Sequence, residues 1–400
     1  MSATFDALAQ KYRPVFARIA DGALAREQDR VLPTEQVGWL KDVGFTGIRV
    51  PAEFGGDGAS LVDLFRLLIE LAAADPHVPQ AFRGHLAFVE DRLVAPGSAE
   101  RDEWLHRFAG GEMVGNAVTE IGSVALGDTT TRLSSAEGDG WLLSGRKYYT
   151  TGSIFAEWID ATALLPDGTE VAALVSTAGG RVTVSDDWNG FGQRLTGSGT
   201  AIFEQAPVRA EHVYPFSRRF WYQTALYQLV LVAVQAGIAR ASARDAVTQL
   251  STRARAFSHG NSAESRHDPQ LLESVGRVDA AAYAAEAVVL RAAASLQAAY
   301  DARDGSETER ATLKRDAELD TARAQVIAGD LAQQAATRLF DALGASATAA
   351  PLQLDRHWRN ARTVSSHNPA LFKARVIGDA LVNDAEPPYE WYVGVPKKVD

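Results

Sequence analysis

The sequence predicts a mostly α-helical protein with a small β-domain in the middle of the chain. Three observations support this: apolar residues recur at helical spacing in the first part, short β-rich runs fill residues 113 to 213, and the helical period returns from about residue 217. A chain of 400 residues has room for two or three domains. We therefore expect an N-terminal helical domain over 1–112, a small antiparallel, barrel-like β-domain over 113–213 and a C-terminal four-helix bundle over 214–400.

The N-terminal part contains two clear amphipathic segments. LPTEQVGWLKDVGF and SLVDLFRLLIELAAAD both place apolar residues three and four positions apart. The glycine-rich VPAEFGGDGAS between them is typical of a turn. Ser60 directly precedes the second segment, so we expect it to cap that helix.

The middle and last parts carry different signals. In the middle, β-type runs such as EVAALVST and GRVTVSDDW are separated by turns that contain Gly, Asp and Pro. The last part has three long Ala-rich segments, which begin near Leu229, Leu271 and Glu309. Their small side chains allow helices to approach closely, as in a four-helix bundle.

The overall composition excludes several classes of protein. The formal net charge is −10 and no basic block stands out, which argues against a nucleic-acid partner. Without cysteine there are no disulfides, cysteine–zinc sites or thiol nucleophiles, and the histidines form no pattern that predicts a metal site. The N-terminus lacks the apolar core of a signal peptide, and the apolar stretch 226–238 is interrupted and too short to cross a membrane. We therefore expect a cytoplasmic enzyme.

Four motifs follow one another along the first two thirds of the chain: VPAEFGGDGAS, NAVTEIGS, GRKYYTTGS and GFGQRLTGSGTAIFEQAPV. GFGQRL and GSGTAI lack the third glycine and the following helix of a dinucleotide loop. In this order, the four motifs resemble the acyl-CoA dehydrogenase family over essentially the whole chain. The resemblance implies the acyl-CoA dehydrogenase-like fold, a flavin held between the β-domain and the bundle, and a homotetramer.

The resemblance also suggests which residues hold the flavin. A reduced flavin needs hydrogen-bond donors and acceptors at its pyrimidine edge and at N5, together with flat apolar walls. Arg255 matches the family's arginine on the flavin phosphate, often across a subunit boundary, with Arg253 as the alternative. Taken singly, the TEIGS and YYTTG segments are also compatible with ordinary strand and turn chemistry. The remaining cofactor-binding candidates are Asn116, Thr119, Ser123, Tyr149, Thr150, Thr151 and Ser366.

The segment RHWRNARTVSSHNPALFKAR, residues 356–375, indicates the branch of the family. Acyl-CoA dehydrogenases abstract an α-proton with a glutamate that is common near this position, whereas this chain has His367 and no carboxylate, so such a dehydrogenase reaction could not start. RNARTVSSHNP instead resembles the flavin-dependent monooxygenase branch, which includes dibenzothiophene monooxygenases, methanesulfinate monooxygenases and amino-sugar N-hydroxylases. In that branch a separate NAD(P)H-dependent reductase supplies reduced flavin, oxygen adds at the flavin C4a atom, and a histidine supports the hydroperoxide.

His367 is therefore the first catalytic candidate. A neutral imidazole can donate one hydrogen bond to a peroxide oxygen and relay a proton. The alternative is a histidine that only caps the turn beside Asn368 and Pro369.

A second cluster of candidates lies in PQAFRGHLAFVEDRL, residues 79–93. In the family a helix here covers the substrate pocket, and its histidine matches His85, the second catalytic candidate. Arg83 suits a small anion, because a guanidinium can hold two acidic oxygens at once. We add Gln80 and Trp188 as substrate-binding candidates, although Trp188 could equally belong to the core of the β-domain, and Arg83 and His85 could be a solvated arginine and a core histidine.

These residues favour an enzyme that oxygenates an alkanesulfinate such as methanesulfinate. The R-x-H pair resembles the alkanesulfinate and sulfone enzymes, whereas Val364 stands where dibenzothiophene monooxygenases have a second histidine. A dibenzothiophene- or sulfone-type S-oxygenase, an amine N-hydroxylase, an acyl-CoA dehydrogenase and a flavin-free scaffold remain as alternatives. We expect reduced FMN rather than FAD, because LGASATAAP at 343–351 keeps only Gly344 of the Gly-Gly element that accommodates adenosine in the dehydrogenases.

Overall fold

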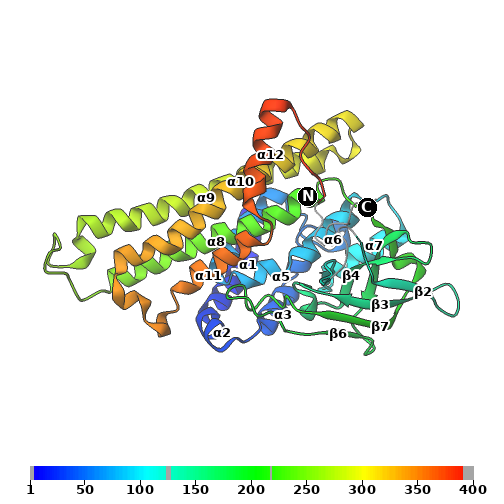
Figure 1. The fold of residues 1–400 in the computed structure, drawn as a ribbon, viewed down its shortest axis with the longest axis horizontal. Helices are drawn as coiled ribbons and strands as arrows, with labels where there is room; N and C mark the ends of the chain where they lie inside the picture. The colour runs from blue at the N-terminus through cyan, green and yellow to red at the C-terminus, as the bar shows by residue number, and fades with distance from the viewer. Residues whose placement is uncertain (1–3, 123–127, 217–218, 391–400) are drawn as a thin grey trace, which may run out of the picture.

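The computed structural model describes residues 4–122, 128–216 and 219–390 and has the predicted order of helices, sheet and helices (Figure 1). The sheet lies at one end of the molecule, and the long C-terminal helices extend away from it. The predicted fold class, mostly helical with a central β-domain, is confirmed. The predicted division into three domains stays a prediction. The predicted boundary after residue 112 falls between helix α7 and strand β1. The predicted boundary after residue 213 falls inside the last strand, which continues for two more residues.

The N-terminal part consists of short and medium helices. Ser60 caps α4 as expected, because its Oγ accepts a hydrogen bond from the Asp63 backbone N–H at 3.0 Å. The apolar face of α4 is buried against the C-terminal helices in one large core cluster, so the two helical parts share a core. The helices are α1 (Phe5–Asp21), α2 (Ala23–Asp29), α3 (Thr34–Asp42), α4 (Leu61–Ala74), α5 (His77–Ala81), α6 (Arg83–Val94) and α7 (Ala99–Ala109).

The middle part is one curled sheet with the strand order β6-β7-β3-β2-β4-β5-β8, and β1 pairs with β4. The expected antiparallel pattern holds for most pairs, but β1 and β2 both run parallel to β4. Each of the two is only four residues long, and β2 meets β4 only at the Arg132–Leu164 pair, so the pattern of alternating residues could not reveal their direction. The strands are β1 (Val114–Ala117), β2 (Arg132–Ser135), β3 (Trp141–Lys147), β4 (Trp158–Leu164), β5 (Glu170–Ser176), β6 (Val182–Val184), β7 (Ala201–Val208) and β8 (Val213–Pro215).

The C-terminal part is built on three long helices, α8 (Gln223–Ser251), α9 (Pro269–Asp301) and α10 (Glu307–Leu343), which pack along one another. Small residues allow this packing: a Cβ at Gly237 of α8 would lie 2.7 Å from the Ile69 carbonyl oxygen of α4. Helix α11 (Asp355–Ser366) packs on α8 and α10, and α12 (Ala370–Asn383) then projects from the body (Figure 1).

Helix α8 is the one described helix that is long and apolar enough to cross a membrane by length and composition. However, 83% of its apolar window is buried against the rest of the protein. This burial is what a core helix of a helical bundle shows.

Candidate active site

The turn between α11 and α12 brings His367 to Arg83, at the start of α6. The Arg83 Nη2 atom lies 3.1 Å from the His367 Nε2 atom, although the two residues are 284 positions apart in the chain. Two of the candidates named from the sequence therefore meet in the fold.

Arg83 is a buried cation without an acidic partner. Its side chain is 7% exposed, and within the described residues no carboxylate lies within ion-pair distance of it. Its guanidinium lies 5.0 Å from the centre of the Tyr227 ring of α8, and its Nε atom has no hydrogen-bond partner among the residues that the structure describes. Burial lowers the pKa of Arg83 from its usual range. A guanidinium in this state has donors available for an anion.

His367 is neutral at physiological pH. The surrounding protein atoms, and then the positive charge of Arg83, lower the pKa of its imidazole to about 3, although the residue as a whole is exposed to solvent. Arginine can only donate, so His367 Nε2 accepts from Arg83 and the ring proton is on Nδ1. No hydrogen bond from the Nδ1–H group is found among the described residues, so this group can donate to a ligand.

His85 does not belong to this pair, and we withdraw its catalytic assignment. It is fully buried, its Nε2–H donates to the Thr46 carbonyl oxygen at 2.8 Å, and its Nδ1 accepts from the Val114 backbone N–H at 3.2 Å. Burial lowers the pKa of His85 to about 4. Both ring nitrogens are bonded to the main chain, so His85 joins α6 to the segment around Thr46 and to strand β1. The imidazole has no nitrogen left to bind a substrate.

Asn116 and Gln80 have free polar atoms close to this pair. Asn116 is buried at strand β1, and a Cβ at Gly84, next to Arg83, would lie 2.7 Å from its Oδ1 atom. Within the described chain neither Asn116 Oδ1 nor Gln80 Oε1 has a hydrogen-bond partner. Unpartnered buried oxygens are costly, so both positions favour a bound polar molecule.

An exposed aromatic corner borders the β-domain. Tyr149 is 49% exposed and has a φ of 56°, a left-handed backbone conformation that is rare for an aromatic residue. Its ring meets the Trp188 ring edge to face, with centroids 5.9 Å apart, and Trp188 Nε1 donates to the Gly192 carbonyl oxygen. Trp188 therefore belongs to the surface of the β-domain rather than to its core.

The two threonines after Tyr149 are buried below this corner. Thr150 Oγ1 donates to the Gly199 carbonyl oxygen at 2.9 Å, and Thr151 Oγ1 lies 2.6 Å from Ser198 Oγ. The next residue, Gly152, has a φ of 80° and contacts α5 so closely that a Cβ would lie 2.0 Å from the Ala81 carbonyl oxygen. The glycine of YYTTG thus sets the β-domain directly against the helix that carries Gln80.

The sequence reasoning missed a buried ion pair that holds the NAVTEIGS segment. Lys147 Nζ lies 2.7 Å from Glu120 Oε1, and Glu120 also accepts from the backbone N–H groups of Thr130 and Thr131. Thr119 is next to this anchor and accepts from the Tyr148 backbone N–H at 2.8 Å. The Lys in GRKYYTTG was the available signal, because a lysine at an inward strand position needs a buried acid.

Helix α11 also holds the GFGQRL segment. Asn360 Oδ1 accepts from the Gln193 backbone N–H at 2.6 Å, and Arg359 donates to the Phe191 carbonyl oxygen at 3.1 Å. Gln193 is buried, and both atoms of its side-chain amide lack a partner in the part of the chain that the structure describes. These contacts place the β-domain loop against the helix that ends at His367.

The other predicted cofactor residues lie elsewhere. Arg255 is exposed and follows the end of α8, whereas Arg83 stacks on Tyr227 near its start, so about 36 Å of helix separate them. Arg253 is not a good alternative, because its guanidinium donates to the Leu343 carbonyl oxygen at the end of α10. Ser366 Oγ donates to the Arg362 carbonyl oxygen. Ser123 lies outside the described residues.

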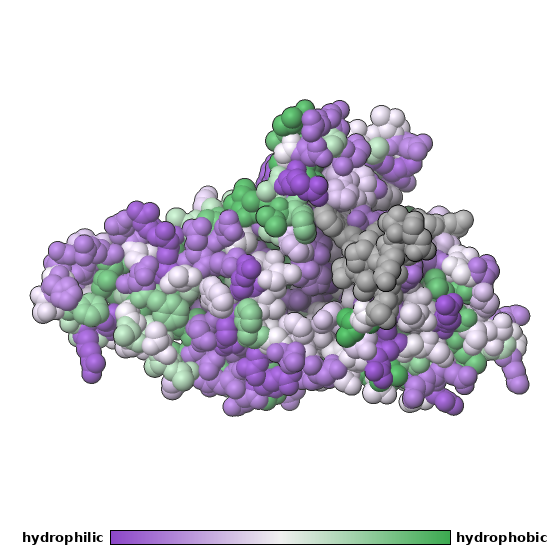
Figure 2. Space-filling model, viewed as in Figure 1, coloured by the Kyte–Doolittle hydropathy of each residue, from purple (hydrophilic) through white to green (hydrophobic). Residues whose placement is uncertain are grey.

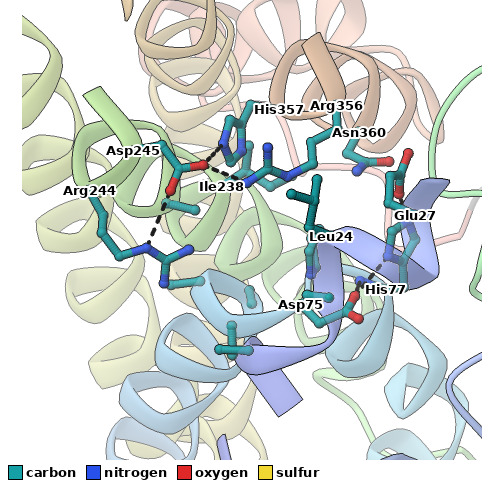
Figure 3. Close-up of a pocket in the computed structure, with 17 residues that line it drawn as sticks. Leu24, Glu27, Asp75, His77, Ile238, Arg244, Asp245, Arg356, His357 and Asn360 are labelled. Atoms are coloured by element: carbon teal, nitrogen blue, oxygen red, sulfur yellow. Dashed lines mark hydrogen bonds and ion pairs between the residues drawn. The ribbon is translucent and has the colours of Figure 1, made fainter. Parts of the chain in front are cut away.

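A cavity of about 200 Å³ lies away from this site, between α2, α4, α8 and α11 (Figure 3). At one end Asp245 accepts from Arg356 at 2.5 Å and from His357 at 2.8 Å. At the other end His77 lies between Asp75 at 2.8 Å and Glu27 at 3.2 Å. No group of three His, Asp or Glu among the described residues is placed to hold a metal ion. The charges of this paired-charge cavity are matched within the protein, in contrast to Arg83.

Known proteins of similar sequence identify the family. The chain is 30% identical to a Pseudomonas putida protein described as a probable FMNH2-dependent monooxygenase, SfnC, over 391 residues that cover 95% of this chain and 96% of the relative. The chain belongs to the flavin-dependent monooxygenases of the acyl-CoA dehydrogenase fold. Residues 5–112 and 229–370 of this monooxygenase match the acyl-CoA dehydrogenase N-terminal and C-terminal domains. The family resemblance seen in the sequence is confirmed.

Other relatives of this monooxygenase have different substrates in their names. It is 29% identical to a dibenzothiophene monooxygenase of Mycolicibacterium goodii, with 88% of each chain covered. Its fold is similar to the solved structure of methanesulfinate monooxygenase MsuC from Pseudomonas fluorescens, with a TM-score of 0.85 and 26% identity over 97% of this chain and 100% of that one. FMN-bound TdsC from Paenibacillus has the same fold, with a TM-score of 0.84 at 24% identity over 94% of this chain and 98% of that one.

The residues of this monooxygenase fit a flavin at the edge of the β-domain. The Tyr149–Trp188 corner offers an exposed aromatic wall, and the unpartnered Asn116 Oδ1 and the Thr151 hydroxyl offer polar contacts. A flavin needs both kinds of surface.

Proposed function

We propose that the protein is the oxygenase of a two-component system, which uses reduced FMN and molecular oxygen to oxygenate a small organosulfur anion, with methanesulfinate as the first candidate. The observation that carries this proposal is Arg83, a buried guanidinium with no acidic partner in the described chain, in contact with the neutral imidazole of His367. A sulfinate supplies the missing negative charge in a form that a guanidinium holds with two hydrogen bonds.

Bound reduced FMN supplies the two electrons that activate oxygen. The overall reaction is R–SO2⁻ + O2 + FMNH2 → R–SO3⁻ + FMN + H2O, in which sulfur gains one oxygen atom and the other oxygen leaves as water. Arg83 holds the sulfinate oxygens, and the Nδ1–H of His367 donates to the reacting oxygen and can pass a proton to the departing one. Tyr227, stacked on Arg83, excludes water from the guanidinium.

The proposed FMN site is formed by the β-domain and α11. Asn116, Thr119, Thr150 and Thr151 lie on its polar side, and Tyr149 and Trp188 form its aromatic wall. Ser366 keeps lone pairs free at the end of α11, and Ser123 stays a candidate of the NAVTEIGS segment. The FMNH2-dependence in the name of the P. putida relative supports FMN over FAD. A separate NAD(P)H-dependent flavin reductase is the proposed partner, and its need for NAD(P)H places the system in the cytoplasm.

We also propose a homotetramer, in which Arg255 of one copy reaches the flavin phosphate in another. Arg255 follows the end of α8, and the bundle extends away from the sheet (Figure 1), so Arg255 is too far along the helix to meet the other flavin residues of its own chain. Exposed apolar side chains support an interface: α12 presents Leu371, Leu381 and Val382, each more than 70% exposed, and Figure 2 shows apolar side chains among the polar ones of this projecting helix. A patch of this kind on a folded protein marks an interaction surface.

The names of the relatives also support an aromatic sulfur substrate as a second candidate. Against it, Arg83 would be left as an unpaired buried charge beside an uncharged ring system, which is costly. Val364, one turn before His367, is a buried apolar residue at the position where dibenzothiophene monooxygenases have a second histidine, which also speaks against this candidate.

The test is a substrate panel with chemically reduced FMN and oxygen. Methanesulfinate, a dialkyl sulfone, dibenzothiophene and a primary amine are each supplied, and the product and hydrogen peroxide formed per FMNH2 oxidised are measured. We expect sulfonate to account for most of the FMNH2 oxidised with methanesulfinate, and peroxide to dominate with the uncharged substrates. Product from dibenzothiophene or the amine but none from the sulfinate would contradict the proposal.

A further inference from the structure

The turn that carries His367 is held by side chains from two different helices. It consists of His367, Asn368 and Pro369 between the end of α11 and the start of α12. From α6, Arg83 contacts the imidazole. From α10, Gln325 Nε2 donates to the Asn368 carbonyl oxygen at 2.9 Å.

The side chain of Gln325 has a defined orientation. It is 5% exposed, and a carbonyl oxygen can only accept, so the amide nitrogen must face Asn368. Its Oε1 atom then points away from the turn and has no hydrogen-bond partner in the described chain, like Thr321 Oγ1 one turn earlier on α10. A leucine at this position would avoid the cost of that unpartnered oxygen, so the stabilising contribution of the amide is its bond to the turn.

Helices α8, α10 and α11 pack against one another next to the turn. A Cβ at Gly329, one turn after Gln325, would lie 3.2 Å from Gln235 Oε1 of α8 and 4.0 Å from the Ser365 side chain of α11. Gly329 therefore leaves space for the Gln235 side chain of α8, and α11 lies at contact distance on the same face of α10. The turn backbone itself contributes the His367 N–H bond to the Val364 carbonyl oxygen and the Phe372 N–H bond to the Pro369 carbonyl oxygen.

We propose that Gln325 is a positioning residue of the active site: through its bond to the Asn368 carbonyl oxygen, it holds the turn so that His367 stays in contact with Arg83 and at the reacting oxygen. The inference rests on the proposed role of His367. Catalytic groups need placement within about 0.5 Å, and a turn released at one of its two anchors does not keep that precision.

The first test is Gln325→Glu, which keeps the shape of the side chain and makes its hydrogen bond depend on pH. When ionised, the introduced carboxylate cannot donate and repels the Asn368 carbonyl oxygen. When protonated, its O–H donates again. Burial raises the pKa of a carboxyl group above about 4.3, which moves this change toward neutral pH. The ionisable groups around the turn are His367, Arg83, and the Glu318–Lys373 ion pair of α10 and α12.

At pH 8 we expect at least a tenfold loss of product per FMNH2 in Gln325→Glu, with hydrogen peroxide in its place, and a return toward the wild-type yield as the pH falls to 6. The Michaelis constant for the substrate should stay unchanged, because Arg83 is intact. The matched control is Gln334→Glu on the exposed side of the same helix, which should behave like wild type at every pH. A wild-type yield at pH 8, or a loss that does not recover at pH 6, would overturn the proposal.

A second measurement is independent of turnover. The pKa of His367 can be followed by NMR of labelled histidine, and in wild type it should be about 3. Gln325→Met, which removes the donor without adding charge, should move this pKa up toward the ordinary 6.5 as the ring leaves Arg83. An unchanged His367 titration in a folded Gln325→Met protein contradicts the positioning role, whereas failure of the proposed substrate alone would appear only in the product assay.

Discussion

Two charged regions of this protein lie at the boundary between its helical parts, and they are built differently. In the paired-charge cavity His77 lies on Asp75, which also pairs with Arg26 behind the cavity wall, and Arg356 lies on Asp245. In the candidate active site, Arg83 and His367 contact each other, with no acid beside them among the described residues. The first region holds the fold together, and the second keeps its hydrogen-bonding capacity for a ligand.

Two histidines show that a shifted pKa does not by itself mark the functional site. Burial lowers the pKa of His357 to about 4, and the surrounding protein atoms together with the charge of Arg83 lower the pKa of the more exposed His367 to about 3. His357 uses its Nε2 to bind Asp245, whereas the Nδ1–H of His367 has no partner assigned in the described structure. Unused hydrogen-bonding capacity, rather than the pKa, separates the two sites.

The largest effect is expected from Asp75→Ala in the paired region. Asp75 is 1% exposed, and its loss leaves Arg26 in the core without its acid and His77 with Glu27 alone. The free energy of unfolding should fall by about 3–5 kcal/mol in urea denaturation. Product yield per folded molecule should stay at the wild-type level.

The control Asp355→Ala breaks an exposed i,i+4 pair with Arg359 and should lower the free energy of unfolding by less than about 1 kcal/mol. Equal losses in the two variants would remove the distinction between buried and exposed pairs.

The next effect concerns the two histidines. His367→Ala should reduce product per FMNH2 about a hundredfold, or roughly 2–4 kcal/mol, because it removes a donor at the reacting oxygen. FMNH2 is still consumed and the oxygen appears as peroxide, while the unfolding curve stays unchanged. His357→Gln is the matched variant and should lose stability but keep its product yield. Full yield in His367→Ala would leave this histidine without a catalytic role.

The smallest effect is expected from Arg83→Met. It should raise the Michaelis constant for a sulfinate about ten- to a hundredfold, since hydrogen bonds to charged groups contribute about 1.5–3 kcal/mol. Stability should stay the same or rise slightly, because methionine replaces a buried cation that has no acidic partner.

Arg26→Met, which breaks the ion pair with Asp75, should instead lower stability and keep the Michaelis constant. Urea unfolding and steady-state kinetics on both variants distinguish the two roles, and loss of stability in Arg83→Met would show that Arg83 is structural.

Much of this protein could be predicted from local patterns in the sequence. Helical spacing of apolar residues, the Ser60 cap and the β-rich run in the middle depend on nearest neighbours, and the structure has all three. The order of the motifs indicated the family, which the relatives confirm. His367 and Arg83 stood out because their residue types, in those motifs, suit oxygen and anion chemistry.

The tertiary structure decided the roles of individual residues within those motifs. Arg83 and His85 are two positions apart on α6 and therefore point about 200° apart around the helix, so one meets His367 and the other the main chain at Thr46 and Val114. Gln325 and Asn360 carry no signal in the sequence, because the groups they bind lie far away along the chain. A side chain's hydrogen-bond partner, and so whether any of its capacity remains for a ligand, is set by how distant segments pack, and that packing is decided only when the whole chain has folded.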